Sequence, residues 1–247
     1  MSLVRALSSA DALFVAYHGV LVPPLKPRYR ATPDLAILEL LSLLRKKLKI
    51  IVVSTRSCSA ISKIAENVDA VVCCNGCEAV LPELIVVPRT VHSHVHVVLD
   101  IARKLEVSEE LTVELRRTSF GDAVGIAVEW GGSLKKKDRE MLEVAIKLAL
   151  DNGLRVYSEP QAGFVEIYSP QCSRGKAVEI VKRLLDIKIA AYLGESALDN
   201  EAFKSVEIPI AVRHELNKEV DLEAYHQIPR ENLSVLLKDL VRTLHIE

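Results

Sequence analysis

The sequence predicts an α/β protein whose main sheet is parallel and which carries a smaller, inserted α+β module. Two patterns predict this class. Short apolar runs alternate with segments in which apolar residues recur every three or four positions, as in strands joined by crossover helices. In the middle of the chain, two runs instead alternate apolar and polar residues, as antiparallel strands with one exposed face do. A length of 247 residues accommodates one core with one such module.

The N-terminal part of the chain has the order strand, helix, strand, helix, strand. Strands are expected at 13–17, 50–53 and 70–74, because these runs lack the charges that an exposed face would carry. The first helix is expected to have Thr32 as its N-cap and Pro33 at its first position, and the second to cover 57–67. This order predicts parallel strands joined by right-handed crossovers.

The dipeptide Asn75-Gly76 lies between two apolar runs and predicts a hairpin, through which the chain turns back and leaves the parallel sheet. The module that follows is expected to contain strands at 111–115 and 124–130 and a helix that ends at Gly153. We therefore expect a core formed by 1–81 and 162–247 and an inserted module over 82–161.

The remaining segments are expected to return to the core. The predicted strands are 163–168, 189–193 and 208–212, and the predicted helices are 175–185, 200–206 and 231–244.

Composition excludes several classes of protein. Lys and Arg total 32 and Asp and Glu 33, so the net charge of −1 does not favour nucleic-acid binding. No run approaches the roughly 18 apolar residues of a membrane span, and the N-terminus lacks the long apolar region of a secretory signal. A cytoplasmic protein is expected. The six Asn and three Gln hint at a thermophile.

The five cysteines are an odd number at uneven spacings, as expected of thiols in a reducing compartment. A thermophilic source would make an intracellular disulfide less surprising. Cys74 and Cys77 have the C-x-x-C spacing of zinc or redox sites, but two buried thiols at a strand end are the simpler interpretation. His92, His94 and His96 are metal-ligand candidates, and a solvated segment of the module is the simpler interpretation for them.

Ligands of parallel α/β sheets bind beyond the carboxyl ends of the strands. The loops at that edge are 16–21, 54–58, 172–175 and 194–199. Read in order, their sequences resemble the four motifs of the haloacid dehalogenase-like (HAD) phosphatases.

Three longer segments carry a narrower resemblance. Most similar to trehalose-6-phosphate phosphatases are LFVAYHGVLVPPLKPRYRATPDLAILELLSLL and YLGESALDNEAFKSV. The Cof-type (IIB) branch, in which a cap lies between motifs two and three, is indicated by GFVEIYSPQCSRGKAVEIV. The resemblance spans essentially the whole chain and implies a HAD-like Rossmannoid core with a parallel sheet and an inserted α+β cap.

The resemblance also implies a chemistry. In these phosphatases an Asp after the first strand attacks phosphorus, and an Asp two residues later acts as acid and base. Mg²⁺ is held by the first Asp and by the acidic fourth motif. Here the nucleophile position is Ala16, which has no atom able to attack phosphorus, and the acid/base position is His18. Val20 replaces the Thr of the first motif.

The other motifs are partly retained. Glu195 and Ser196 stand where the fourth motif has paired aspartates, and Asp199 keeps the later Asp, so Glu195 and Asp199 are the remaining candidate metal ligands. The phosphate-holding positions are occupied by three residues, Ser54, Arg56 and Arg174.

Each of these residues also has a simpler explanation. Ser54 is a possible helix cap, Arg174 a structural partner of Asp199, and His18 a loop residue that fills a vacated site.

Two functions follow. The first is a catalytically inactive protein that binds a sugar phosphate or a protein partner such as a glycosyltransferase, with no cofactor. The alternative is an active sugar-phosphate phosphatase, for trehalose-6-phosphate or a related compound, that uses His18, Glu195 and Asp199 and requires Mg²⁺. Neither nucleic acid nor membrane is expected as a partner.

Overall fold

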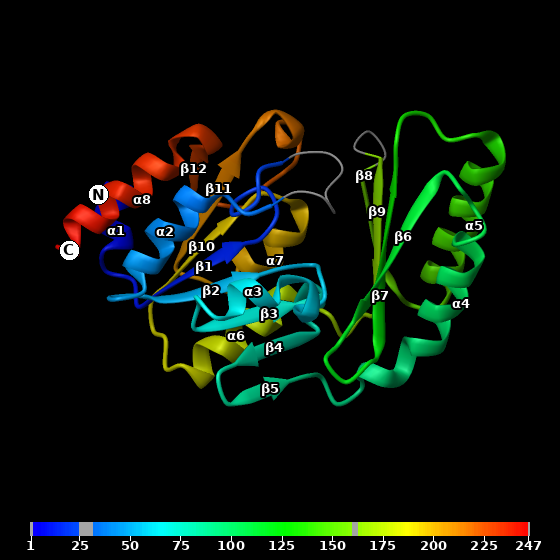
Figure 1. Ribbon diagram of the computed structural model, residues 1–247, viewed down its shortest axis with the longest axis horizontal. Coiled ribbons are helices and arrows are strands. Elements are labelled where there is room, and N and C mark those ends of the chain that lie inside the picture. The colour runs from blue at the N-terminus through cyan, green and yellow to red at the C-terminus, as the bar shows by residue number, and fades with distance from the viewer. Residues whose placement is uncertain (1, 25–31, 160–162, 247) are drawn as a thin grey trace.

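The computed structural model describes residues 2–24, 32–159 and 163–246, which form two sheets (Figure 1). The larger sheet has eight strands in the order β12-β11-β10-β1-β2-β3-β4-β5. Its strands are β1 (Ala12–Ala16), β2 (Lys49–Val53), β3 (Ala70–Cys73), β4 (Glu78–Leu81), β5 (Leu84–Val86), β10 (Ala190–Gly194), β11 (Ile208–Arg213) and β12 (His226–Pro229). The pairing is parallel from β12 to β3 and antiparallel at β4 and β5.

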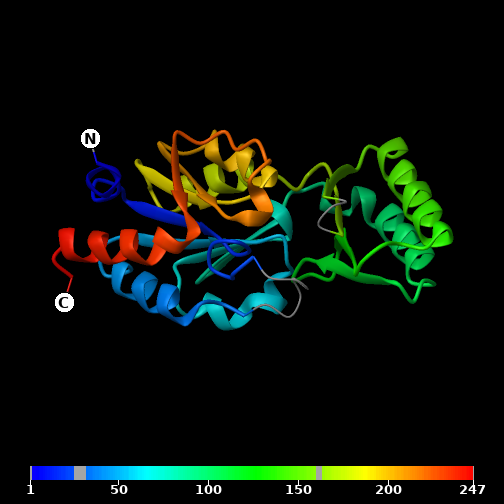
Figure 2. The same cartoon turned by 90° about the horizontal axis from the view of Figure 1, so that it is seen from above.

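The central strand β1 is buried along its whole length between β10 and β2. Helices cover both faces of the sheet, which explains why its inner strands contain almost no polar residue (Figure 2). The helices are α1 (Leu3–Leu7), α2 (Leu35–Leu44), α3 (Ser62–Ala65), α6 (Arg174–Leu184), α7 (Asn200–Phe203) and α8 (Leu233–Thr243). On one face α2 packs against α8, and on the other α6 packs against α7 (Figure 2).

Residues 87–159 and 163–168, here called the insert, contain the second sheet, which is antiparallel in the order β6-β7-β9-β8. Its elements are α4 (Val95–Leu105), β6 (Leu111–Arg117), β7 (Ala123–Trp130), α5 (Lys136–Asp151), β8 (Arg155–Glu159) and β9 (Phe164–Tyr168). The two helices lie on the face of this sheet that is turned away from the core (Figure 1). The insert has its own cluster of buried apolar residues, separate from that of the core.

The predicted α/β fold with a mostly parallel core sheet is confirmed, and the strand pairings place the ends of the inserted module at other residues than 82 and 161. At the start of the module, β5 pairs with β4 at the edge of the larger sheet, so the insert begins after Val86 rather than at residue 82. The predicted boundary between 161 and 162 falls outside the described residues. The strand after it, β9, pairs with β7 and β8 and so belongs to the insert. The core resumes only after Tyr168, because the apolar run of β9 fits either sheet equally well.

Several elements differ in detail from those predicted. The N-cap of α2 is Asp34, whose carboxylate accepts hydrogen bonds from the backbone N–H groups of Ala36 and Ile37, and not Thr32. The expected helix over 57–67 is a 3₁₀ turn at Cys58–Ile61 followed by the four-residue α3. The hairpin at Asn75-Gly76 forms, but the returning strand β4 stays in the larger sheet as an antiparallel neighbour of β3.

The prediction that all five cysteines are thiols is wrong. Cys58 is joined to Cys73 and Cys77 to Cys172 by disulfides, and Cys74 alone is a free, buried thiol. These pairs join segments that are distant in sequence, so spacing alone did not reveal them. In the part of the chain that the structure describes, every helix is too short or too polar to cross a bilayer.

Helix α8 should depend on its buried leucines for stability. Leu237 is fully buried under the sheet, whereas Val235 on the same helix is 55% exposed. We expect Leu237→Ala to lower the free energy of unfolding by about 2–5 kcal/mol, because it removes buried methyl groups and leaves a cavity. The matched change Val235→Ala should alter it by less than about 0.5 kcal/mol. Urea denaturation followed by circular dichroism measures both, and equal effects would contradict the assigned packing.

Candidate functional site

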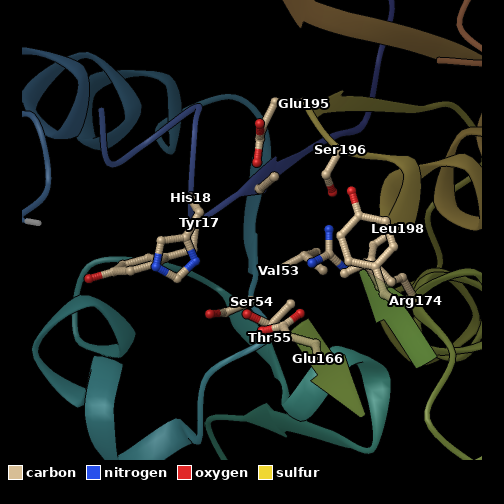
Figure 3. A pocket seen from close by; sticks show the side chains of 12 residues that line it. Tyr17, His18, Val53, Ser54, Thr55, Glu166, Arg174, Glu195, Ser196 and Leu198 are labelled. Atoms are coloured by element: carbon tan, nitrogen blue, oxygen red, sulfur yellow. The ribbon is translucent and has the colours of Figure 1, made fainter. Parts of the chain in front are cut away.

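A pocket lies at the carboxyl ends of β1, β2 and β10, where the core faces the insert (Figure 3). Parallel strands bring their ends to one edge, so loops distant in sequence meet there. Five of the residues predicted from sequence line this pocket: Ala16, His18, Ser54, Arg174 and Glu195. Asp199 lies behind the lining and is fully buried.

The end of β1 presents no reactive group to the pocket. Ala16 is buried and offers only its methyl group. The chain then turns at Gly19, whose φ of +72° is readily adopted by glycine. A Cβ at this position would lie 2.1 Å from Cγ of Glu195, so the Glu195 side chain packs directly on the Gly19 backbone. A residue larger than glycine at position 19 would therefore clash with the Glu195 side chain.

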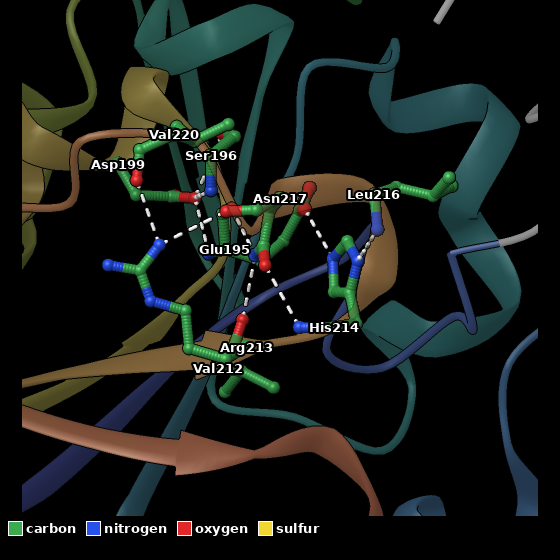
Figure 4. Close-up of polar contacts among 9 residues, drawn as sticks. All are labelled: Glu195, Ser196, Asp199, Val212, Arg213, His214, Leu216, Asn217 and Val220. Carbon is green, nitrogen blue, oxygen red and sulfur yellow. Dashed lines mark hydrogen bonds and ion pairs between the residues drawn. The ribbon is translucent and has the colours of Figure 1, made fainter.

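Asp199 is held by several donors from the end of β10. Its carboxylate accepts hydrogen bonds from the Tyr192 hydroxyl at 2.6 Å and from the Ser196 hydroxyl at 3.0 Å. It also accepts from the backbone N–H groups of Glu195 and Ser196, each at 2.9 Å (Figure 4). Its other partner is the guanidinium of Arg174. Burial opposes ionisation, but Arg174 and these donors outweigh it and hold the pKa of Asp199 below its ordinary value.

Arg174 is the first residue of α6 and is 5% exposed. Besides pairing with Asp199, it donates from Nε to Oδ1 of Asn75 at 2.8 Å. Asn75 belongs to the tight turn between β3 and β4, where its φ is +55°. The guanidinium thus ties three distant segments together, and its structural pairing with Asp199 is present.

Glu195 is engaged by a residue that the sequence analysis did not consider. His214, just after β11, lies 2.9 Å from Oε2 of Glu195 through its Nε2 atom (Figure 4). The backbone N–H of Leu216 donates to Nδ1 of the same ring at 3.2 Å, so the geometry assigns the proton to Nε2, which donates to Glu195. Asn217 fixes the loop by donating to the carbonyl oxygens of Glu195 and Val212. His214 follows the carboxyl end of a parallel strand, and that rule could have identified it.

The residues present do not fit a Mg²⁺ ion. Mg²⁺ requires an octahedral set of oxygen ligands, usually including carboxylates with free lone pairs. Here Asp199 is surrounded by an arginine, a tyrosine and backbone donors, and Glu195 is held by His214. Throughout the described ranges, no group of three or more His, Cys, Asp or Glu side chains is placed to bind a metal ion.

The three predicted phosphate-binding residues are near one another but have protein partners. Ser54 Oγ accepts a hydrogen bond from the backbone N–H of Arg56 at 3.0 Å, and it caps no helix, because the next helical turn begins only at Cys58. Arg56 lines an adjoining pocket shared with His18 and lies 3.7 Å from a carboxylate oxygen of Glu114 in β6. Ser54 and Arg174 therefore face one pocket and Arg56 the next.

The insert contributes an acidic residue that the sequence analysis missed. Glu166 of β9 is 1% exposed and lies across the pocket from Glu195 (Figure 3). One of its oxygens is 3.6 Å from Nη2 of Arg116, but among the described residues neither oxygen accepts a hydrogen bond. A charged residue in the middle of the otherwise apolar strand FVEIY was the available signal.

The remaining candidates are not brought to the pocket lining. His92 pairs with Asp122 at 2.8 Å, and His94 lies 3.4 Å from the Ser169 hydroxyl. Cys77 is in a disulfide, which removes it as a zinc ligand. Burial raises the pKa of Cys74 to about 12, so this thiol is not a nucleophile at neutral pH.

Solved structures have a similar fold over nearly the whole of this chain. The C-terminal domain of the C. albicans trehalose-6-phosphate phosphatase superposes with a TM-score of 0.75 at 17% identity, over 97% of this chain and 95% of that one. A trehalose-6-phosphate phosphatase related protein gives 0.69 at 19% identity, over 94% and 97%. A HAD subclass IIB sugar phosphatase gives 0.65 at 13% identity, over 96% and 100%. This chain has the HAD-like fold of these proteins.

At these identities the likeness is one of fold, and it confirms the HAD-like fold that the motifs predicted. No protein-family model matches the sequence, and no curated protein matches it. Within this HAD fold, the pocket occupies the strand ends where the resemblance placed the four motifs, with Ala16 at the end of β1.

The Asp199 network should make stability depend on pH. Asp199→Asn leaves Arg174 buried without a charged partner, so we expect the free energy of unfolding at pH 7 to fall by about 3–5 kcal/mol. Because the pKa of Asp199 is lowered in the folded state, its ionisation stabilises the fold above about pH 3.8, and this contribution is lost as pH falls through the folded value. The difference between wild type and variant should therefore narrow below pH 4.

Urea denaturation between pH 3 and pH 8 measures this effect. The control is Asp186→Asn, at a residue whose side chain is 84% exposed and which pairs only with Lys188 among the described residues. A difference between wild type and Asp199→Asn that stays constant over the whole range would contradict the ionised, buried pair.

Proposed function

We propose that this chain is a non-hydrolytic ligand-binding protein that uses a phosphatase fold. The observation that carries the proposal is Ala16, whose methyl group faces the pocket at the end of β1. A methyl group forms no aspartyl-phosphate, and loss of a covalent nucleophile costs several powers of ten in rate.

The carboxylates around Ala16 support the same proposal. Glu195 is held at Oε2 by His214 and Asp199 by Arg174, so both carboxylates already have protein partners with which a metal ion or a water would have to compete. His214 also uses both of its ring nitrogens, one to accept and one to donate. The acidic side chains on the core side of the pocket are thus paired with basic side chains of the core itself.

A sugar phosphate is the ligand class we propose. Ser54 and Arg174 lie on the core side of the pocket, and Tyr157 and Glu166 lie on the side of the insert. An anionic group is suited to Ser54 and to Nη2 of Arg174, since Nε and Nη1 of this residue are used by Asn75 and Asp199. Sugar hydroxyls are suited to donate to the carboxylate of Glu166, which accepts no hydrogen bond from the described residues. The solved structures of the same fold include trehalose-6-phosphate phosphatases and a sugar phosphatase.

The alternative function is an active phosphatase that uses His18 as acid and base and holds a metal with Glu195 and Asp199. The bonds described above disfavour it, because both carboxylates would have to leave their partners first. A protein partner such as a glycosyltransferase remains a second proposal for the ligand, and co-purification from the source organism tests it.

We expect no release of inorganic phosphate from trehalose-6-phosphate or from a panel of sugar phosphates, with Mg²⁺, Mn²⁺ or Co²⁺ present. Ala16→Asp alone should not restore turnover, because the carboxylates that would hold a metal keep their protein partners. A malachite-green assay measures both proteins. Robust turnover by the wild type would falsify the proposal and favour the alternative function.

Binding without turnover is the second expectation. Trehalose-6-phosphate should raise the melting temperature by mass action and give a measurable heat in titration calorimetry. Glu166→Gln should weaken binding roughly tenfold, since it removes a charged hydrogen-bond acceptor. The control Glu106→Gln changes an exposed residue of the insert and should bind like the wild type. Equal affinities in all three proteins would remove Glu166 from the site.

A further inference from the structure

The five cysteines converge near the end of β3, although they come from distant parts of the chain. The Cys58–Cys73 disulfide spans 15 residues and joins two segments of the core. The Cys77–Cys172 disulfide spans 95 residues and joins the start of β4 to residues 169–173, here called the return segment, which leads from β9 of the insert to α6 of the core. The whole insert therefore lies within one covalent loop.

Hydrogen bonds and close packing also hold the return segment in place. The Ser173 hydroxyl donates to Glu201 of α7, in the core, at 2.8 Å. On the side of the insert, the carbonyl oxygen of Cys172 accepts a hydrogen bond from Nη1 of Arg155 of β8 at 3.1 Å. A Cβ on Gly76 would lie 2.2 Å from the carbonyl oxygen of Ser173, so the turn between β3 and β4 is in direct contact with this segment. The disulfide closes a junction that is already tightly packed.

The same junction carries a residue of the pocket. Cys77 follows Asn75 by two positions, and Cys172 precedes Arg174 by two positions. The hydrogen bond from Arg174 to Asn75, at 2.8 Å, therefore joins the same two segments as the disulfide. Separation of these segments would break that bond and free Arg174 to move relative to the turn.

We propose that Cys77 and Cys172 are a redox pair whose disulfide fastens the return segment to the core and holds Arg174 in the pocket. The pair forms by exchange with a small-molecule disulfide. One cysteine thiolate attacks and breaks the S–S bond of the reagent, and the second cysteine thiolate then displaces the reagent's other half. The two protons lost by the cysteines end on the two released thiols. A small dithiol reverses the reaction and takes up the oxidising equivalents as its own disulfide.

Burial decides when this exchange takes place. Cys77 and Cys172 are both fully buried, so a reagent reaches them only before the segment packs or when it opens. The neighbouring thiol of Cys74 has a pKa of about 12 and does not compete for either disulfide at neutral pH. The pairing is thus protected from rearrangement while the junction is closed.

The experiment compares the wild type with two double variants, C77S/C172S and the matched control C58S/C73S. Peptide mapping by mass spectrometry, without reduction, of air-oxidised wild type should recover a peptide that links Cys77 to Cys172, with Cys74 as the alkylated thiol. Hydrogen exchange should then be about tenfold faster over residues 169–176 in C77S/C172S, and unchanged there in C58S/C73S.

Wild-type protein unfolded and refolded with dithiothreitol should reproduce the faster exchange, and subsequent treatment with oxidised glutathione should reverse it. This arm decides the question if C77S/C172S does not fold. Recovery of Cys77 and Cys172 as free thiols from oxidised protein would overturn the proposal, as would equal exchange over residues 169–176 in both variants. None of these readouts depends on the proposed ligand or on hydrolysis.

Discussion

The buried ion pair between Arg174 and Asp199 is the constraint on which the arrangement of the pocket depends. A charge removed from water is tolerated only if it is paired and hydrogen-bonded, and here both members are. The hydroxyl of Tyr192 donates to Asp199, and burial together with that carboxylate raises its pKa well above the ordinary value. Through Asn75, the pair also fixes the turn between β3 and β4. The ion pair and its hydrogen bond to Asn75 thus position the end of β10, the start of α6 and the end of β3 relative to one another.

Charge neutralisation by protein groups distinguishes this pocket from one built for a metal ion. His214 and Arg174 each satisfy one acidic side chain of the fourth motif. The exception is Glu166, which comes from the insert and whose nearest cation is shared with Glu114. An unsatisfied acceptor is costly to bury, and such groups in native proteins are often found where a ligand supplies the missing donor. The core and the insert thus contribute differently to the pocket. The acidic side chains from the core are paired with protein groups, whereas Glu166 from the insert can still accept hydrogen bonds from a ligand.

The features of the fold that were predicted correctly depend on local sequence pattern. The fully apolar runs of β1, β2 and β3 were predicted because no exposed strand has that composition, and the motif positions placed Ala16, Ser54 and Arg174 at one edge. The edge strands β8 and β12 were missed because they are short and partly exposed. The partners of Glu195 and Cys172 were also missed, since each lies in a segment that only the tertiary fold brings near. Pairings of this kind depend on topology, which a single sequence leaves open.

The pairing of β1 with β10 has a consequence for how the chain is made. The central strand is synthesised before the insert, but its partner on one side, β10, lies beyond the insert, near residue 190. Until that partner is synthesised, β1 has an apolar, hydrogen-bonding edge without its neighbour, which is the kind of surface that aggregates or recruits chaperones. The insert, whose last strand ends at Tyr168, is complete earlier. The insert can therefore fold during translation before the core is complete, while the unpaired edge of β1 remains exposed to aggregation or to chaperones.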